Sequence, residues 1–185
     1  MKLDPIGDSI SSLASKLQAK LSGGNMKEES TGRESSDTIP LLLRRFHAVA
    51  LKLLQRYGGR PTLEIKDEHD VQDLLAALLL LFFDDIRREE WGPSYAGKST
   101  RADFLLKTEG ILMEVKKTYD GRSEKQVGDE LIVDIEHYRQ RPNCKVLVCF
   151  VYDPEHRIAN PVGFERDLSR TEGDLRIEVV VAPKA

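Results

Sequence analysis

The chain has 185 residues, of which 40% are hydrophobic and 32% are charged. This length predicts one domain with an appendage, and the apolar content is too high for a disordered chain. The formal net charge of −3 argues against a surface that is basic all over, but it leaves room for a local basic groove. The longest apolar run, residues 71–83, is too short to span a membrane, and no signal sequence opens the chain. Two cysteines are too few for a disulfide framework or a structural zinc site, so we expect a cytoplasmic protein.

The N-terminal part of the chain predicts a helix followed by a linker. Apolar residues recur at helical spacing over residues 5–21, so we expect an amphipathic helix within residues 1–21. Residues 22–38 contain almost nothing to bury and are rich in serine, glycine and glutamate, which indicates a flexible linker. Met26 lies in this linker, and a start there would remove the first helix, so both starts stay open.

Two further helices are predicted before the first strands. A helix over residues 40–57 begins with proline and ends before a glycine pair, and it would pack on the core as part of a segment 39–66. Asp67 and Asp70 have the spacing of a capping box for the next helix. That helix is apolar on nearly all sides, so we expect it between the sheet and the preceding helix. Residues 67–185 would form the core.

Apolar runs and turn signals after residue 84 predict a sheet with helices on it. The expected elements are strands at 101–107 and 111–118, a helix at 124–139, a strand at 146–152, a short helix at 161–169 and a strand at 175–182. This order predicts an α/β fold with a mixed central sheet flanked by helices, and with an N-terminal helical extension.

Three charged residues are predicted to converge on the first two of these strands. Glu114 and Lys116 are two residues apart, so a strand places both side chains on one face. A two-residue turn at Glu109 and Gly110 pairs Asp103 with Lys116. A loop shifted by two residues pairs Asp103 with Glu114 instead. Both registers put the three side chains on the same face, whereas a slip of one residue would separate them.

Asp103 and Glu114 together form a candidate metal site. Two neighbouring carboxylates repel each other, and a divalent cation removes that conflict. Hard oxygen ligands suit Mg²⁺, with Mn²⁺ as a substitute, better than they suit zinc. Such a cation can polarise a phosphoryl oxygen and lower the pKa of a bound water, while Lys116 positions that water or stabilises charge on the phosphate. The alternative is a half-exposed strand that carries ordinary surface charges.

The pattern Asp103…Glu114-Val115-Lys116 resembles the active-site signature of the PD-(D/E)XK nuclease superfamily. The wider segments VQDLLAALLLLFFDDIR, PSYAGKSTRADFLL, GILMEVKKT, LIVDIEHYR and LVCFVYDPEHRIANP are similar to the restriction endonuclease domain of the DpnII/MboI type. The resemblance covers residues 68–168 and implies a restriction-endonuclease-like core and a Mg²⁺-dependent nuclease that cuts DNA. It further implies that Asp103, Glu114 and the main-chain carbonyl of Val115 bind the metal, and that Lys116 is the catalytic lysine.

The resemblance also points to residues around this centre. The first core helix often carries an extra acid, for which Glu68 is the candidate, although the helix dipole also favours an acid there. The helix after the lysine often supplies a polar residue, and Gln126 and Glu130 are the candidates, with a solvated helix face as the alternative. Phosphate contacts are expected from basic residues on both sides of the site, namely Lys98, Arg101, Lys117, Arg122 and Lys125.

These patterns predict a Mg²⁺-dependent endonuclease that hydrolyses phosphodiester bonds in DNA, as the effector of a restriction or other anti-phage defence system. Three alternatives stay open: a non-catalytic DNA- or partner-binding module of the same fold, a structure-specific nuclease of repair or recombination, and a nuclease that cuts RNA. By analogy with the family we expect a homodimer or higher homo-oligomer, because cutting both strands requires two active sites. The N-terminal helices would dock a regulatory protein or drive assembly, and no membrane partner is expected.

Overall fold

The computed structural model of the protein describes residues 27–91, 101–139 and 144–184. The chain divides into two compact units, Met1–Asp37 and Thr38–Ala185. The predicted helix within residues 1–21 and the candidate Lys98 lie outside the described residues. Among the helices that are described, none combines the length and apolar character needed to cross a bilayer.

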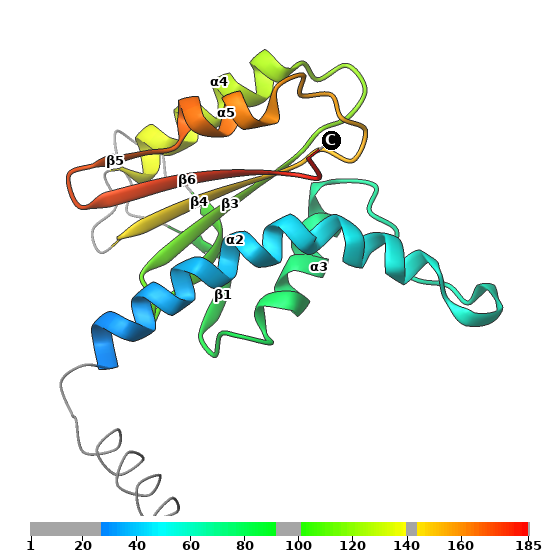
Figure 1. The fold of residues 1–185 in the computed structure, drawn as a ribbon, viewed down its shortest axis with the longest axis horizontal. Coiled ribbons are helices and arrows are strands. Elements are labelled where there is room, and N and C mark those ends of the chain that lie inside the picture. The colour runs from blue at the N-terminus through cyan, green and yellow to red at the C-terminus, as the bar shows by residue number, and fades with distance from the viewer. Residues whose placement is uncertain (1–26, 92–100, 140–143, 185) are drawn as a thin grey trace, which may run out of the picture. The chain divides into compact units, whose positions relative to one another are not determined.

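A six-stranded mixed sheet forms the centre of the larger unit (Figure 1). Its strands are β1 (Ile86–Trp91), β2 (Arg101–Leu106), β3 (Ile111–Lys117), β4 (Val146–Tyr152), β5 (Arg170–Glu172) and β6 (Leu175–Ala182). They lie in the order β1-β2-β3-β4-β6-β5. β4 runs parallel to both of its neighbours, β3 and β6, and the remaining pairs are antiparallel. This confirms the predicted mixed sheet.

Helices cover both faces of the sheet (Figure 1). One face is covered by α2 (Lys27–Leu54), through its part after Thr38, and by α3 (Glu68–Leu79). The other face is covered by α4 (Glu124–Tyr138) and α5 (Pro161–Leu168). Phe150 of β4 packs into the apolar core beneath α2 and α3, and Val151 packs into the core beneath α4 and α5. β4 is therefore buried on both faces, as its continuous apolar run predicts.

The helices that flank the candidate site begin at capping residues. Asp67 accepts a hydrogen bond from the Asp70 amide at 3.1 Å, and the Asp70 carboxylate accepts one from the Asp67 amide at 3.2 Å. This is the predicted capping box at the start of α3. Ser123 and Gln126 form the same reciprocal box at the start of α4. These two boxes define where both helices begin beside β3.

The helix α2 differs from the predicted second helix at both ends. It begins at Lys27, so residues 27–38, expected to belong to a flexible linker, are helical, and Pro40 lies inside the helix instead of at its start. Extending a helix that packing already stabilises is easier than nucleating one, so this extension needs no apolar stripe of its own. At the other end, α2 stops at Leu54, before the predicted end at residue 57, and Tyr57 is 88% exposed in a short 3-10 helix (Tyr57–Gly59).

The two edge strands, β1 and β5, are missing from the sequence prediction. β1 reads Ile-Arg-Arg-Glu-Glu-Trp, which shows no apolar alternation, and β5 has only three residues.

Beyond the end of β5, side chains form hydrogen bonds with the outer edge of β6. Ser169 Oγ accepts from the Val179 amide at 2.9 Å, and Glu165 Oε1 accepts from the Val181 amide at 2.8 Å. Short edge strands and such side-chain partners protect a sheet from pairing with other chains.

The hairpin of β2 and β3 adopts the second of the two predicted registers. Phe104 pairs with Met113, so the turn covers residues 107–110 and the expected two-residue turn is wrong. Loops of four residues are common in hairpins and are built around an ordinary turn. Continued along the strands, this register brings Asp103 opposite Glu114.

Phe46 tests whether α2 belongs to the folded core. Its fully buried ring packs edge-on against Phe150 and Tyr152, with ring centroids 5.2 and 5.0 Å away. Phe46→Ala should lower the free energy of unfolding by about 3 to 5 kcal/mol. Leu41→Ala, at a 51% exposed position of the same helix, should change it by only about 0.5 kcal/mol. Urea unfolding followed by circular dichroism measures both, and equal losses would contradict a core position for Phe46.

Candidate active site

Asp103 lies where strand β2 separates from β3. The paired residues of these strands extend to Phe104 and Met113. Beyond that point the Asp103 carboxylate takes the place of a strand partner, because its Oδ2 accepts a hydrogen bond from the Val115 amide at 2.7 Å. Its Oδ1 accepts a second hydrogen bond from Nε2 of Gln72, a buried residue of α3, at 2.8 Å. A main-chain amide and a helix side chain thus hold this carboxylate.

The backbone around Asp103 departs from a regular strand. On the neighbouring strand β1, Glu89 has φ +55°, and it lies between the two residue pairs that flank Asp103. Ala102 packs into the core beneath α4, whereas Phe104 packs into the core beneath α3. Regular alternation would place these two residues on one face. The alternation of β2 is therefore interrupted at Asp103, and the Asp103 carboxylate points sideways to the main chain of β3. The sequence had predicted that Asp103 lies on the same sheet face as Glu114 and Lys116.

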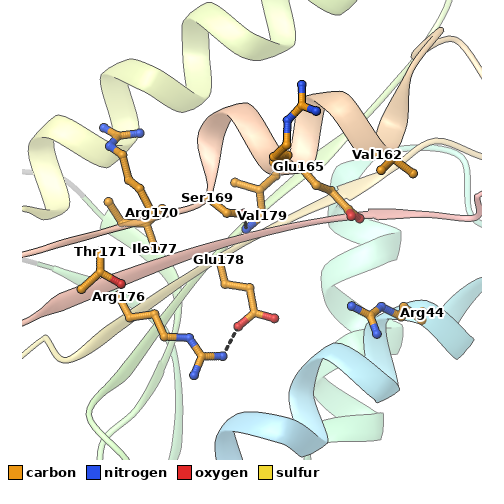
Figure 2. Close-up of a pocket in the computed structure, with 11 residues that line it drawn as sticks. Arg44, Val162, Glu165, Ser169, Arg170, Thr171, Arg176, Ile177, Glu178 and Val179 are labelled. Atoms are coloured by element: carbon orange, nitrogen blue, oxygen red, sulfur yellow. Dashed lines mark hydrogen bonds and ion pairs between the residues drawn. The ribbon is translucent and has the colours of Figure 1, made fainter.

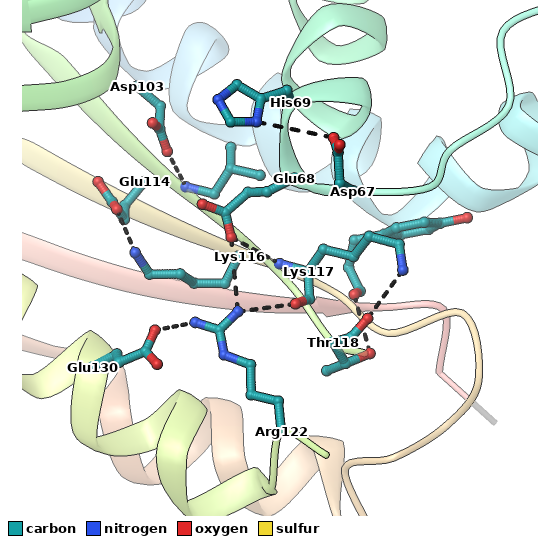
Figure 3. A network of polar contacts seen from close by, with 12 residues as sticks. Asp67, Glu68, His69, Asp103, Glu114, Lys116, Lys117, Thr118, Arg122 and Glu130 are labelled. Atoms are coloured by element: carbon teal, nitrogen blue, oxygen red, sulfur yellow. Dashed lines mark hydrogen bonds and ion pairs between the residues drawn. The ribbon is translucent and has the colours of Figure 1, made fainter. Parts of the chain in front are cut away.

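Glu114 and Lys116 lie on the face of β3 that α4 covers. Figure 3 shows both side chains near Asp103, where β2 separates from β3. Glu114 is buried; its Oε1 accepts a hydrogen bond from Lys116 Nζ at 2.6 Å, and its Oε2 accepts one from Tyr138 Oη at 2.7 Å. Lys116 Nζ also forms an ion pair with Asp134 Oδ2 at 2.9 Å. Asp134 and Tyr138 are one turn apart in α4, so one face of the helix reaches both residues of β3.

Two carboxylates, those of Glu114 and Asp134, contact the Lys116 ammonium, and the Asp103 carboxylate lies near Glu114. Burial and the nearby Glu114 carboxylate raise the pKa of Asp103 from 3.8 to about 7. Burial also raises the pKa of Glu114, against the opposing effect of Lys116. Burial alone would lower the pKa of Lys116, but the carboxylates of Glu114 and Asp134 outweigh it and raise that pKa, so the lysine stays charged. An added cation would relieve the excess of negative charge.

The oxygen atoms of this centre fit a cation of the magnesium type. Each carboxylate oxygen has two lone pairs, so Asp103 and Glu114 keep acceptor capacity beside their hydrogen bonds. The Val115 amide points toward β2, and a strand residue directs its N–H and C=O to the same edge, so the Val115 carbonyl is available there too. Within the described part of the chain, no three Asp, Glu, His or Cys side chains gather closely enough to hold a metal. A cation here would need the carbonyl and water besides the two carboxylates.

Glu68 and Arg122 connect both flanking helices to the end of β3 (Figure 3). Glu68 Oε2 accepts from the Lys117 amide at 3.2 Å and lies 3.8 Å from Nη1 of Arg122. That same nitrogen donates to the Lys117 carbonyl at 3.0 Å, and Nη2 of Arg122 pairs with Glu130 of α4. The Arg122 side chain is only 8% exposed. Arg122 therefore links α3, β3 and α4, and both Arg122 and Glu130 have partners within the fold.

Two more predicted residues have structural partners instead. Lys117 points to the α3 side of the sheet, is buried, and donates from Nζ to the Thr118 carbonyl at 3.0 Å. It therefore presents almost no surface to DNA, because strand alternation turns it away from Lys116. Gln126 Oε1 accepts from the amide and hydroxyl of Ser123 at 2.8 and 3.0 Å. This is its place in the capping box, so it is not brought to Lys116.

Two of the predicted basic residues, Arg101 and Lys125, are exposed. Arg101 is exposed at the start of β2 and forms an ion pair with Glu89 at 3.2 Å. Lys125 is exposed in the first turn of α4. Of the five expected phosphate contacts, these two keep an exposed position among the residues that the structure describes.

Three residues of the centre were missed by sequence reasoning: Gln72, Asp134 and Tyr138. Each offered a weak signal. Gln72 is a polar residue inside an otherwise apolar helix, and such a residue needs a partner when buried. Asp134 lies four residues before Tyr138 in the predicted helix 124–139, so both belong to one face of that helix. The spacing of Asp134 and Tyr138 does not predict which strand residues they contact.

A larger hollow of about 600 Å³ lies at the opposite edge of the sheet, between α5, β5, β6 and Arg44 of α2 (Figure 2). Arginines dominate its lining, but three of them pair with neighbouring acids: Arg166 with Asp167, Arg170 with Glu172, and Arg176 with Glu178. In the sheet order this hollow is separated from β3 by β4. It therefore does not belong to the centre at Lys116.

The mixed sheet, the helices on both faces and the Asp…Glu-x-Lys centre at the separating ends of two strands define a restriction-endonuclease-like protein. The family model of the DpnII-MboI restriction endonucleases matches residues 37–184, and the chain belongs to this family. Comparison with curated proteins found no match, and comparison with solved structures found none either. Membership of the family supports a nuclease that acts on DNA.

Asp103→Asn tests the charge of this centre. Because the pKa of Asp103 is about 7 in the folded protein and 3.8 ordinarily, the fold binds this proton more tightly than the unfolded chain does. Wild-type stability should therefore fall as the pH rises through this interval. Asparagine cannot ionise. Its side-chain oxygen can still accept a hydrogen bond from the Val115 amide, and its NH₂ group can donate to the Gln72 oxygen once the Gln72 amide has rotated.

With EDTA present, Asp103→Asn should be more stable than the wild type by about 2 to 4 kcal/mol at about pH 8, and this difference should shrink to about 0.5 kcal/mol at about pH 4. Urea unfolding across this pH range measures both proteins. A variant that is less stable than the wild type at the alkaline end would contradict the raised pKa.

Proposed function

We propose that the protein is a Mg²⁺-dependent DNA endonuclease, with Mn²⁺ as a substitute, and that Asp103, Glu114 and Lys116 form its active site. One observation carries the proposal. A half-buried carboxylate, Asp103, and a buried one, Glu114, lie on neighbouring strands near a charged lysine where β2 and β3 separate, in a chain of the DpnII-MboI restriction endonuclease family. Asp103, Glu114 and the Val115 carbonyl would hold the cation.

The charged state of Lys116 decides what it can do in phosphodiester hydrolysis. When bound, the cation would polarise a phosphoryl oxygen and lower the pKa of a coordinated water. Lys116 is held as an ammonium by Glu114 and Asp134, so it can only donate hydrogen bonds and cannot accept a proton from water. We therefore assign it the stabilisation of negative charge that develops on the phosphate.

Neighbouring residues would position these groups and the substrate. Gln72 orients the Asp103 carboxylate, and Glu68 fixes the main chain directly after Lys116 through the Lys117 amide. Arg101 of β2 and Lys125 of α4 are exposed and are our candidates for phosphate contacts. A few such side chains provide local positive charge on a protein whose net charge is −3.

Family membership supports a place in restriction or another anti-phage defence system, with the nuclease as effector. We further propose a homodimer or higher homo-oligomer, because cutting both strands of a duplex requires two active sites. Assembly or a regulatory partner would act through the N-terminal residues, of which Met1–Asp37 form a unit separate from the core. Deletion of residues 1–38 should change the oligomeric mass or the nuclease activity, and light scattering with a cleavage assay measures both. A deletion that changed neither would overturn this assignment.

Cleavage of plasmid and linear DNA tests the activity and the site together. The wild type should cut with Mg²⁺ or Mn²⁺ and not with EDTA, and Lys116→Ala should reduce the rate by about 10²-fold or more. Lys107→Ala removes an exposed lysine from the turn of the same hairpin and is the matched control. It should cut at the wild-type rate.

Several outcomes would contradict the proposal. Cutting that persists in EDTA would exclude a cation mechanism, and equal rates for Lys116→Ala and the control would exclude Lys116 from the site. Absence of cutting by the wild type with every cation, together with binding in a gel shift, would favour a DNA-binding module of the same fold. A parallel assay on RNA separates the two nucleic acids as substrates.

A further inference from the structure

Asp134 contributes a second anionic partner to the lysine of the proposed site. Lys116 Nζ lies 2.6 Å from Glu114 Oε1 and 2.9 Å from Asp134 Oδ2. The Lys116 side chain is 11% exposed and that of Asp134 is 21% exposed, so water screens this pair weakly. The two carboxylates therefore determine together where the ammonium lies.

The two partners of Lys116 differ in how a bound cation would affect them. Glu114 is a proposed ligand, so the cation would neutralise its charge and would itself repel the neighbouring ammonium. The lysine stem has four flexible carbons, which would allow the ammonium to move toward solvent. A shallow pocket of about 330 Å³ lined by Lys116, Asp129, Glu130, Val133 and Asp134 leaves room for such a movement, and among its acids Asp134 is the one that forms an ion pair with Lys116. Asp134 is not among the proposed ligands, and its charge remains available to the lysine.

The position of Asp134 is set by a rigid part of the fold. The next residue, Ile135, is fully buried, and Tyr138 is 1% exposed, with its hydroxyl oxygen 2.7 Å from Glu114 Oε2 and 3.0 Å from the Arg101 carbonyl, two acceptors that share its one proton. Leu131 anchors the preceding turn of α4 in the same core. Side chains on such a helix are held more precisely than side chains on a loop.

We propose that Asp134 is a positioning residue, whose carboxylate keeps the Lys116 ammonium in the active site when a divalent cation occupies Glu114. The inference rests on the proposed function, and it names a residue that acts through the lysine without touching the substrate. Loss of such a partner typically costs about 10- to 100-fold in activity. Asp134→Asn should therefore lower kcat by about this factor at saturating Mg²⁺, with the KM for DNA unchanged. Asp134→Glu, which restores the charge, should recover part of kcat.

A direct readout follows the Lys116 ammonium by NMR in protein labelled with ¹⁵N-lysine, without DNA. The ammonium is buried between two carboxylates, so its protons should exchange slowly and give a signal, which Lys116→Arg assigns by removing it. In the wild type this signal should persist when Mg²⁺ is added. In Asp134→Asn it should disappear on Mg²⁺ addition, because the cation then competes for the remaining partner, Glu114.

Glu136→Gln is the matched control for both measurements. It removes one negative charge from an exposed position of the same helix, where the carboxylate pairs with Arg139 at 3.5 Å. This control should keep the wild-type kcat and the wild-type ammonium signal. Thermal unfolding of Asp134→Asn and Asp134→Glu checks that both variants are folded.

The outcomes separate this inference from the proposed function. If the wild type cuts DNA but Asp134→Asn matches Glu136→Gln in kcat and keeps the signal with Mg²⁺, the positioning role is overturned while the nuclease stands. If Mg²⁺ neither supports cutting nor alters any signal in wild type or variants, the proposed function fails and this inference fails with it. A fall in kcat with an undisturbed signal would also overturn it, because Asp134 would then act by another route.

Discussion

The hydrogen bond from the Val115 amide to the Asp103 carboxylate is the interaction on which the candidate site depends. It replaces a strand-to-strand contact at the point where β2 leaves β3, and it brings an acid from one strand against the acid of the next. Burial and the nearness of Glu114 then raise the pKa of Asp103 to about 7. The fold thus holds two carboxylates together at some cost in stability, as functional sites commonly do. A cation that binds both would remove that cost.

The two faces of the sheet contribute different partners to this pair of strands. From α3, Gln72 holds Asp103 and Glu68 holds the Lys117 amide. From α4, Tyr138 holds Glu114 and Asp134 holds Lys116. Arg122 joins the two sides through Glu68 and Glu130. Asp103, Glu114 and Lys116 thus each have a partner on a packed helix, and the proposed catalysis by positioning and electrostatics requires such pre-organisation.

Sequence reasoning reached the sheet and the three central charges but not their surroundings. A strand repeat of two residues places Glu114 and Lys116 on one face, and the hairpin register brings Asp103 next to Glu114, because both depend on local geometry. The irregular backbone at Asp103 has no such local signal, and the sequence did not predict it. Gln72 meets Asp103 across 31 positions of the chain and Tyr138 meets Glu114 across 24, and such contacts depend on how helices pack on the sheet. The burial of charged side chains depends on the same helix packing. Lys117 and Arg122 were predicted to contact DNA phosphates, but both side chains are buried and have partners within the fold.

The central claim is that Asp103 and Glu114 bind one divalent cation beside Lys116. Crystals grown with Mn²⁺ would test it most directly through the anomalous signal of the ion. The account predicts one peak between the two carboxylates and the Val115 carbonyl, with metal–oxygen distances of about 2.1 Å, and loss of that peak in Asp103→Asn. A structure in which Mn²⁺ binds elsewhere, while Glu114 and Asp103 keep only their present protein partners, would contradict the account.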